Sequence, residues 1–297
     1  MLKALLGLAQ IKQDETKTVE LTPVGAVDRL KLHVHNGRLA LHEWDESYIS
    51  AEVRVRVRGD EHTPMENFWS LRQTGSEVVF EQEMTHNNWF LGLHVSVDVR
   101  MNVPAEILQA NLKTHNGPIE VDLFNGDLRV LTHNGAIRIA DVEGMVHAHT
   151  HNGQIETLRI DGDLTLTSHN GKLEIDKVTG RLQANTHNGQ IQVCDCGNSV
   201  SLTTHNGQIY AQQNQGIQNS WDLVTHNGNI QCYVPRDTDA TYKLHTTSGR
   251  ISGDALPVQT SGYAQKMTVT TGKGTHLIDL HTKSGNIEVR QNRAGME

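Results

Sequence analysis

The chain has 297 residues, a formal net charge of −8 at pH 7 and only 4% aromatic residues. The acidic balance argues against nucleic acid or an anionic membrane as the main partner. Its three cysteines are too few for a disulfide framework.

The first ten residues (MLKALLGLAQ) form a short apolar run with one lysine, and a charged stretch follows over residues 12–17. This run is too short for the three regions of a signal peptide and far too short to span a bilayer. We expect a flexible segment over residues 1–18 and no transmembrane segment. The expected location is the cytoplasm, with a peripheral association with the envelope as the alternative.

Residues 19–110 alternate between apolar and polar positions over several segments, which predicts β-strands. The clearest of these segments are residues 30–41, 48–58, 77–83 and 91–103. The motif Thr63-Pro64-Met65-Glu66 has the form of a capping box with proline at the first helical position, so one short helix is expected up to Leu71. Because an open sheet edge invites unwanted pairing, this region is predicted to cap the repeats that follow.

The tetrapeptide Thr-His-Asn-Gly recurs through most of the remaining chain. Its glycines are 18 residues apart at first, and later steps are 21 and 36 residues. They are Gly117, Gly135, Gly153, Gly171, Gly189, Gly207, Gly228, Gly249 and Gly285. An outlying copy stands at His35-Asn36-Gly37, and Thr85-His86-Asn87-Asn88 is a degenerate one. A fixed period this short is typical of a solenoid, in which each coil buries its apolar face against its neighbours.

The residues around each glycine show which side chains point inward. Two positions after it stands Ile or Leu in every copy, and five positions before it stands Leu, Val or Ala. This alternation indicates strand, Asn-Gly turn and strand, with one face buried. The predicted fold is therefore an all-β parallel β-solenoid, or β-helix, of about 18 residues per coil over residues 111–290. We expect an insertion at residues 253–274 and a tail at 291–297.

The motif's own residues fit a structural role at the turn. Parity places threonine inward, histidine outward and asparagine at the bend, where inward Thr and Asn ladders could satisfy one another and the turn backbone. Glycine would supply the positive φ of a tight corner. The expected turn ladder comprises the motif glycines from Gly117 to Gly228 and the asparagines Asn116, Asn134, Asn152, Asn170, Asn188, Asn206 and Asn227.

Histidine is the one motif residue that this structural role does not require. Seven copies should form an exposed stripe, namely His115, His133, His151, His169, His187, His205 and His226. Imidazole is a common metal ligand, and strands about 4.8 Å apart would let neighbouring rings tilt towards a shared Zn²⁺ or Cu²⁺. A single file offers two ligands per metal, however, and no carboxylate recurs beside it. The alternative is that the rings simply stack, and no cofactor is then expected.

Other candidate sites are weaker. Cys194-Asp195-Cys196 resembles a metal clip, but the register sends Cys194 outward and Cys196 inward, and Cys232 occupies an inward position. Carbohydrate-cleaving β-helices need an acid/base cluster on a groove, and the sequence shows no such cluster, no nucleophile elbow and no phosphate-binding loop. We therefore expect no catalytic residues.

Three segments of the chain resemble the DUF4097 family of bacterial β-strand-repeat proteins, which carry an adhesin label. These segments are residues 34–58, residues 103–121 and residues 277–289, the last with Ser284-Gly285-Asn286-Ile287 as its closing turn. The resemblance covers roughly residues 20–290. It implies a β-solenoid, no established catalysis and, in some members, an envelope-associated or envelope-stress context. The family more often carries Ser or Asn where this chain repeats His.

These observations favour a non-enzymatic β-solenoid that acts as an interaction scaffold, with a protein partner or self-association. A metal- or proton-responsive solenoid that uses the histidine stripe is the first alternative. A carbohydrate-binding or carbohydrate-cleaving β-helix is the second.

Overall fold

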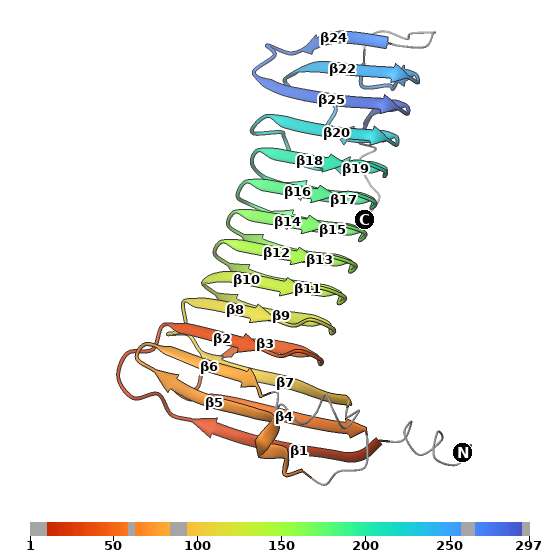
Figure 1. Cartoon of the computed structure of the whole chain (residues 1–297). Coiled ribbons are helices and arrows are strands. Elements are labelled where there is room, and N and C mark those ends of the chain that lie inside the picture. Colours follow the sequence, from red (N-terminus) through yellow and green to blue (C-terminus); the bar gives the residue numbers. More distant parts are fainter. Residues whose placement is uncertain (1–10, 59–62, 84–93, 257–264, 293–297) are drawn as a thin grey trace, which may run out of the picture. The chain divides into compact units, whose positions relative to one another are not determined.

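The computed structural model describes residues 11–58, 63–83, 94–256 and 265–292, and it divides into two compact units, residues 1–143 and 144–297. Both units are built from strands (Figure 1). Among the described residues the one helical element is the 3-10 helix η1 (Met65–Phe68). No helix in this part of the chain has the length and apolar character needed to cross a membrane. The all-β prediction is confirmed.

The first unit contains eleven of the described strands in two sheets. Their bounds are β1 (Ile11–Leu21), β2 (Arg29–His33), β3 (Leu39–Trp44), β4 (Ile49–Arg58), β5 (Trp69–Thr74), β6 (Glu77–Gln82), β7 (His94–Pro104), β8 (Gln109–Lys113), β9 (Ile119–Asn125), β10 (Asp127–Thr132) and β11 (Ile137–Glu143). One sheet has the order β1-β4-β7-β3-β9-β11 and the other has the order β10-β8-β2-β6-β5. Consecutive strands from β6 to β11 thus alternate between the two sheets, as the strand-turn-strand pattern predicts, whereas β3 and β4 share one sheet and β5 and β6 share the other.

The N-terminal region contributes complete coils as well as a cap. β2 pairs in parallel with β6 and β8, and β3 pairs in parallel with β7 and β9. Among the described strands of this unit, the antiparallel pairs are β1 with β4, β4 with β7 and β5 with β6. The expectation that residues 1–18 are flexible is wrong from Ile11 onward, because β1 pairs with β4 along its length.

The predicted helix is also shorter than expected. η1 ends at Phe68 because β5 begins at the next residue, and its N-terminus has no side-chain cap. The capping box at Thr63 is therefore wrong. The degenerate motif copy at residues 85–88 lies outside the described residues.

The second unit contains fifteen of the described strands, again in two sheets. Their bounds are β12 (Val146–Thr150), β13 (Ile155–Asp161), β14 (Leu164–Ser168), β15 (Leu173–Val178), β16 (Leu182–Thr186), β17 (Ile191–Cys196), β18 (Val200–Thr204), β19 (Ile209–Gln212), β20 (Trp221–Asn227), β21 (Ile230–Val234), β22 (Ala240–Ser248), β23 (Ile251–Ser252), β24 (Gln265–Thr271), β25 (His276–Ser284) and β26 (Ile287–Gln291). The orders are β12-β14-β16-β18-β20-β25-β22-β24 and β13-β15-β17-β19-β21-β26-β23.

The last coil of the second unit is out of sequence order. β25 pairs in parallel with both β20 and β22, and β26 pairs in parallel with both β21 and β23. The coil at residues 275–290 therefore lies between two coils that precede it in the sequence. β24, from the expected insertion, pairs antiparallel on the outer edge of β22. This strand ends the sheet with an antiparallel edge.

The core consists of the inward aliphatic positions that the repeat predicts. Ile155, Ile191 and Ile209 have no exposed surface, and the strands of both units alternate between buried and outward side chains. Most inward positions are aliphatic, and the few large side chains that the coils bury include Trp221, Tyr242 and Phe124.

We expect Ile191→Ala to lower the free energy of unfolding by about 2–5 kcal/mol, because the lost methyl groups leave a cavity between stacked coils. Gln190→Ala at the adjacent turn should change it by no more than about 0.5 kcal/mol. The neighbouring bond from the Leu173 amide uses the backbone carbonyl of Gln190, which alanine keeps. Urea unfolding of both variants measures the difference, and equal losses would contradict the inward position of Ile191.

Candidate functional site

The turn that carries the histidines is held by the buried threonines of the motif. Thr132 in the first unit is 2% exposed, and its Oγ1 donates to the carbonyl of Gly117 at 3.1 Å. In the second unit the same bond joins Thr186 to Gly171 at 3.1 Å and Thr204 to Gly189 at 2.9 Å. Each buried hydroxyl thus satisfies a turn carbonyl of the neighbouring coil.

The motif glycines are required for close approach and not for their φ angles. Those at Gly117, Gly135, Gly171, Gly189 and Gly207 do not adopt positive φ, so that expectation is wrong. A Cβ on Gly189 would stand 1.9 Å from the carbonyl oxygen of Gly171 in the neighbouring coil. Stacked turns can therefore reach strand spacing only without a side chain at this position.

The asparagines form exposed ladders whose side chains bond along the stack. In the first unit Nδ2 of Asn134 donates to Oδ1 of Asn116 at 2.7 Å. In the second unit the bonds Asn170 to Asn152, Asn188 to Asn170, Asn206 to Asn188 and Asn227 to Asn206 all measure 2.8 Å. The expectation that the ladders satisfy the turn backbone is confirmed for the threonines, which bond glycine carbonyls, but the expected bonds between inward Asn and Thr are replaced by Asn–Asn bonds on the outer side.

The histidines lie on the outer side of the turns as stacked rings. In the first unit His35, His115 and His133 have ring centroids 5.0 and 4.8 Å apart, with 3° between planes. In the second unit His151, His169, His187, His205 and His226 are separated by 4.8, 5.0, 4.9 and 4.6 Å, with 2° to 13° between planes. His245 and His281 form a separate pair at 4.9 Å.

The parallel orientation of the rings determines whether neighbouring histidines can share a metal ion. An imidazole nitrogen donates its lone pair in the plane of the ring, so two parallel stacked rings present lone pairs that do not converge on a point between them. Shared coordination by neighbours in either stack would require the rings to rotate out of this arrangement. As it stands, the geometry is that of stacked imidazoles.

Two of the stacked histidines, His205 and His35, resist protonation. Desolvation lowers the pKa of His205, and the charges of His226, His187 and Lys283 lower it further. Desolvation followed by the charge of His115 lowers the pKa of His35. Both effects disfavour the imidazolium form, as expected where like charges adjoin.

A comparison with protein-family models gives one decisive result. The model described as Toastrack DUF4097 matches residues 27–290, which include the outlying motif copy, the repeats and the last coil. The chain belongs to the Toastrack DUF4097 family. The resemblance seen in the sequence is thus confirmed over nearly the whole length, and so is the expected β-solenoid.

Matches among solved structures include three bacterial proteins. A candidate adhesin from Bacteroides fragilis is 9% identical, with 95% of this chain and 98% of that chain covered and a TM-score of 0.40. A candidate adhesin from Parabacteroides merdae is 10% identical, with 95% and 97% covered and a TM-score of 0.32. A candidate cell adhesion protein from Clostridium sporogenes is 12% identical, with 94% and 99% covered and a TM-score of 0.22. These scores carry no argument about function. A comparison with curated proteins finds no match.

The cysteines of this Toastrack chain are placed as the register predicts. Cys196 and Cys232 are buried, Cys194 is half-buried, and all three are free thiols. Burial, and then the Asp195 and Asp176 carboxylates, raise the pKa of Cys194 to about 11, which disfavours a thiolate ligand. The side chains of Asp176, Cys194 and Asp195 approach one another, but both carboxylate oxygens of Asp195 accept bonds from Asn214.

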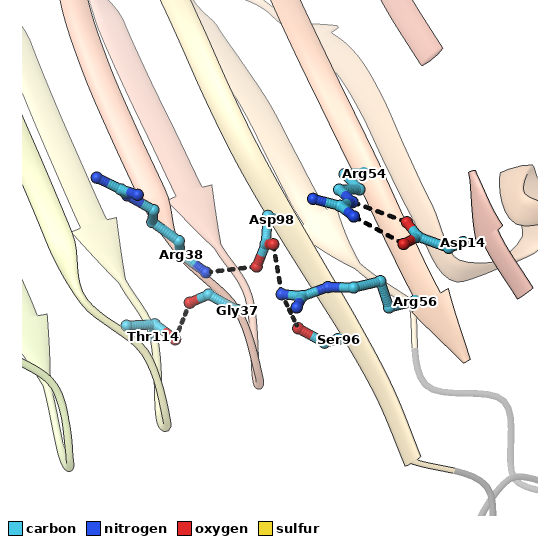
Figure 2. Close-up of polar contacts among 8 residues, drawn as sticks. All are labelled: Asp14, Gly37, Arg38, Arg54, Arg56, Ser96, Asp98 and Thr114. Carbon is cyan, nitrogen blue, oxygen red and sulfur yellow. Dashed lines mark hydrogen bonds and ion pairs between the residues drawn. The ribbon is translucent and has the colours of Figure 1, made fainter. Parts of the chain in front are cut away.

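A second polar cluster, in the first unit, was missed by sequence reasoning. Figure 2 shows Asp98 accepting bonds from the backbone amide of Arg38 and the guanidinium of Arg56, while Arg54 makes two 2.7 Å bonds to Asp14. The alternating Val-Arg pattern of residues 53–58 was its only signal. These pairs balance their charges, so the Toastrack chain uses them to join β1, β4 and β7.

Proposed function

We propose that this chain is a non-enzymatic β-solenoid scaffold that binds a macromolecular partner, either another protein or a second copy of itself, on the outer faces of its coils. The observation that carries this proposal is the identical construction of successive turns. Every motif residue either holds the turn or stacks along it, so the surface repeats with the strand spacing. Such a surface offers many equivalent contacts and no single reactive centre.

The proposal includes a location in the cytoplasm or at the periphery of the envelope. The three free thiols support a reducing compartment, where disulfides rarely persist.

Cross-linking the full chain in bacterial extract, with mass spectrometry of the captured partner, tests whether the chain binds another protein. Sedimentation velocity of the purified chain tests self-association. We expect cross-links through outward lysines such as Lys113 and Lys172, and release of a partner whose mass is unchanged. A partner that is released hydrolysed or chemically modified would overturn the non-enzymatic function.

A second candidate function is a response to protons or metal, favoured by the unbroken stacks of parallel imidazoles in each unit. If ring rotation allows metal binding, Zn²⁺ or Cu²⁺ should raise the melting temperature near pH 7.5. This effect should disappear near about pH 5.5, because the ligands must be neutral. The triple variant His151→Asn, His169→Asn and His187→Asn should fold and lose the shift. Without any metal-dependent shift in the unmodified protein, the metal response is rejected.

A further inference from the structure

A groove with a volume of about 620 Å³ lies on the outer face of the second unit, across the adjacent strands β16, β18, β20, β25 and β22. Outward side chains two positions apart on each strand form its two walls. The threonines between them, Thr186, Thr204 and Thr225, complete the lining, and their hydroxyls are bonded inward to glycine carbonyls.

The first wall is the end of the histidine stack. His187, His205 and His226 follow one another, and strand pairing of β20 with β25 sets Lys283 in the next place. The Nδ1 atom of His226 is buried and has no hydrogen-bond partner. This wall therefore presents a row of imidazoles that ends in an ammonium group.

The second wall consists of residues that strand pairing places in register. Asn185 pairs with Thr203, Thr203 with Val224, and Val224 with His281. His281 stacks on His245 of the next strand. This wall combines polar groups with the apolar side chain of Val224 and the methyl group of Thr203.

The dimensions suit a single extended chain. Four strand steps of about 4.8 Å give a length of roughly 19 Å, and two residues along a strand give a width of about 6.6 Å. A compact metabolite would leave most of such a groove empty. A folded domain could not enter it.

The lining favours an anion. It contains four histidines and Lys283 but no aspartate or glutamate, although the chain as a whole carries a net charge of −8. Protonated imidazoles would add further positive charge, although desolvation and then neighbouring charges lower the pKa of His205. Beyond the second wall, strand pairing sets Asp222 beside Asp279 and Asp279 beside Lys243, and Asp222 interacts electrostatically with Asp279 and His281. The most cationic part is therefore the wall formed by His187, His205, His226 and Lys283.

The repeat distance selects among linear anions. An extended peptide presents side chains on one face at about 6.6 Å intervals, out of step with rungs about 4.8 Å apart. Single-stranded nucleic acid needs free aromatic faces for stacking, and these imidazole faces already cover one another. A pyranose unit advances its chain by close to one strand spacing, and its C–H groups can contact the apolar lining.

We propose that the groove binds an acidic linear polysaccharide, whose carboxylates pair with Lys283 and with protonated His187, His205 and His226. Charge-assisted hydrogen bonds of this kind are about twice as strong as neutral ones. The inference goes beyond the scaffold function and does not depend on it. Failure of one proposal can be distinguished from failure of the other, because the scaffold is tested by partner capture and the groove by titration with a purified glycan.

Isothermal titration of the full chain with polygalacturonate provides the test. We expect binding near pH 5.5 that weakens about tenfold or more near pH 7.5, since the imidazoles lose their charge. The triple variant His205→Asn, His226→Asn and Lys283→Gln should bind at least about tenfold more weakly near pH 5.5. The matched variant His115→Asn, His133→Asn and Lys113→Gln changes the same residue types outside the groove, so its affinity should stay within about twofold.

Several outcomes would overturn the proposal. These are no binding of polygalacturonate near pH 5.5, equal losses in the two triple variants, or equally tight binding of a neutral glycan such as dextran. Tighter binding of polyglutamate or single-stranded DNA would assign the groove to a peptide or a nucleic acid instead. Thermal melting of both variants tests whether any loss of binding is due to unfolding.

Discussion

Gly189→Ala is expected to prevent native folding or to lower the free energy of unfolding by more than about 4 kcal/mol. The new Cβ would stand 1.9 Å from the carbonyl oxygen of Gly171 and 2.8 Å from Oγ1 of Thr186. Neither atom can move away easily, because that hydroxyl donates to that carbonyl. The Asn188 amide also donates to the carbonyl of His169, which fixes the distance between the two turns. Circular dichroism with urea unfolding measures the loss.

Gly216→Ala is the matched control in the same unit. A Cβ at Gly216 would meet no heavy atom within 4 Å, and this residue does not adopt positive φ. The change should therefore alter the free energy of unfolding by no more than about 1 kcal/mol, and a smaller unfolded-state entropy could make it stabilising. Similar losses at Gly189 and Gly216 would show that close approach of the turns is not what requires glycine in the motif.

The sequence predicts the coil well because its periodicity records burial directly. Ile191 and Thr186 are both buried where parity places them, and the strand on each side of the turn follows. Alternation with a period of two residues follows from strand geometry, so the buried positions can be identified from the sequence.

Backbone conformation was less predictable. Leu123, Asp141, Arg159, Lys177 and Asp195 adopt positive φ at intervals of 18 residues, yet they belong to four different residue types. Non-glycine residues rarely take this conformation without support from neighbouring structure. Here the support comes from the stacking of coils, and the sequence of a single coil does not specify that stacking.

The groove could not be predicted for a topological reason. Lys283 and His281 lie far along the chain from His187, and β25 reaches β20 only because the last coil enters between two earlier ones. Sequence order would instead place β22 beside β20, so Thr247 would follow His226 and the wall would lack its ammonium group. A repeat pattern specifies the shape of each coil but does not specify which coils are adjacent.

Stability is expected to fall as the pH drops from about 7.5 to about 5.5. The pKa of His205 and that of His35 are lowered in the folded chain, first by desolvation and then by neighbouring charges. A histidine with a lowered folded-state pKa binds fewer protons when folded than when unfolded. Protonation therefore favours the unfolded chain, and the loss begins as the pH passes through the unfolded value near 6.5.

The pH range distinguishes the effect of these histidines from that of the Asp239 carboxylate. Hydrogen bonds from Thr275, Lys273 and Gly274 lower the pKa of Asp239 to about 2, so its contribution is lost only in much stronger acid. Urea unfolding at both pH values measures the change in the midpoint. The double variant His35→Asn and His205→Asn should show a smaller change, because it removes the two imidazoles whose pKa is lowered in the folded chain, and the shorter asparagine leaves the buried threonines and glycines in place. A midpoint that rises on acidification, or a variant with undiminished pH dependence, would show that the stacked imidazoles do not govern stability in this range.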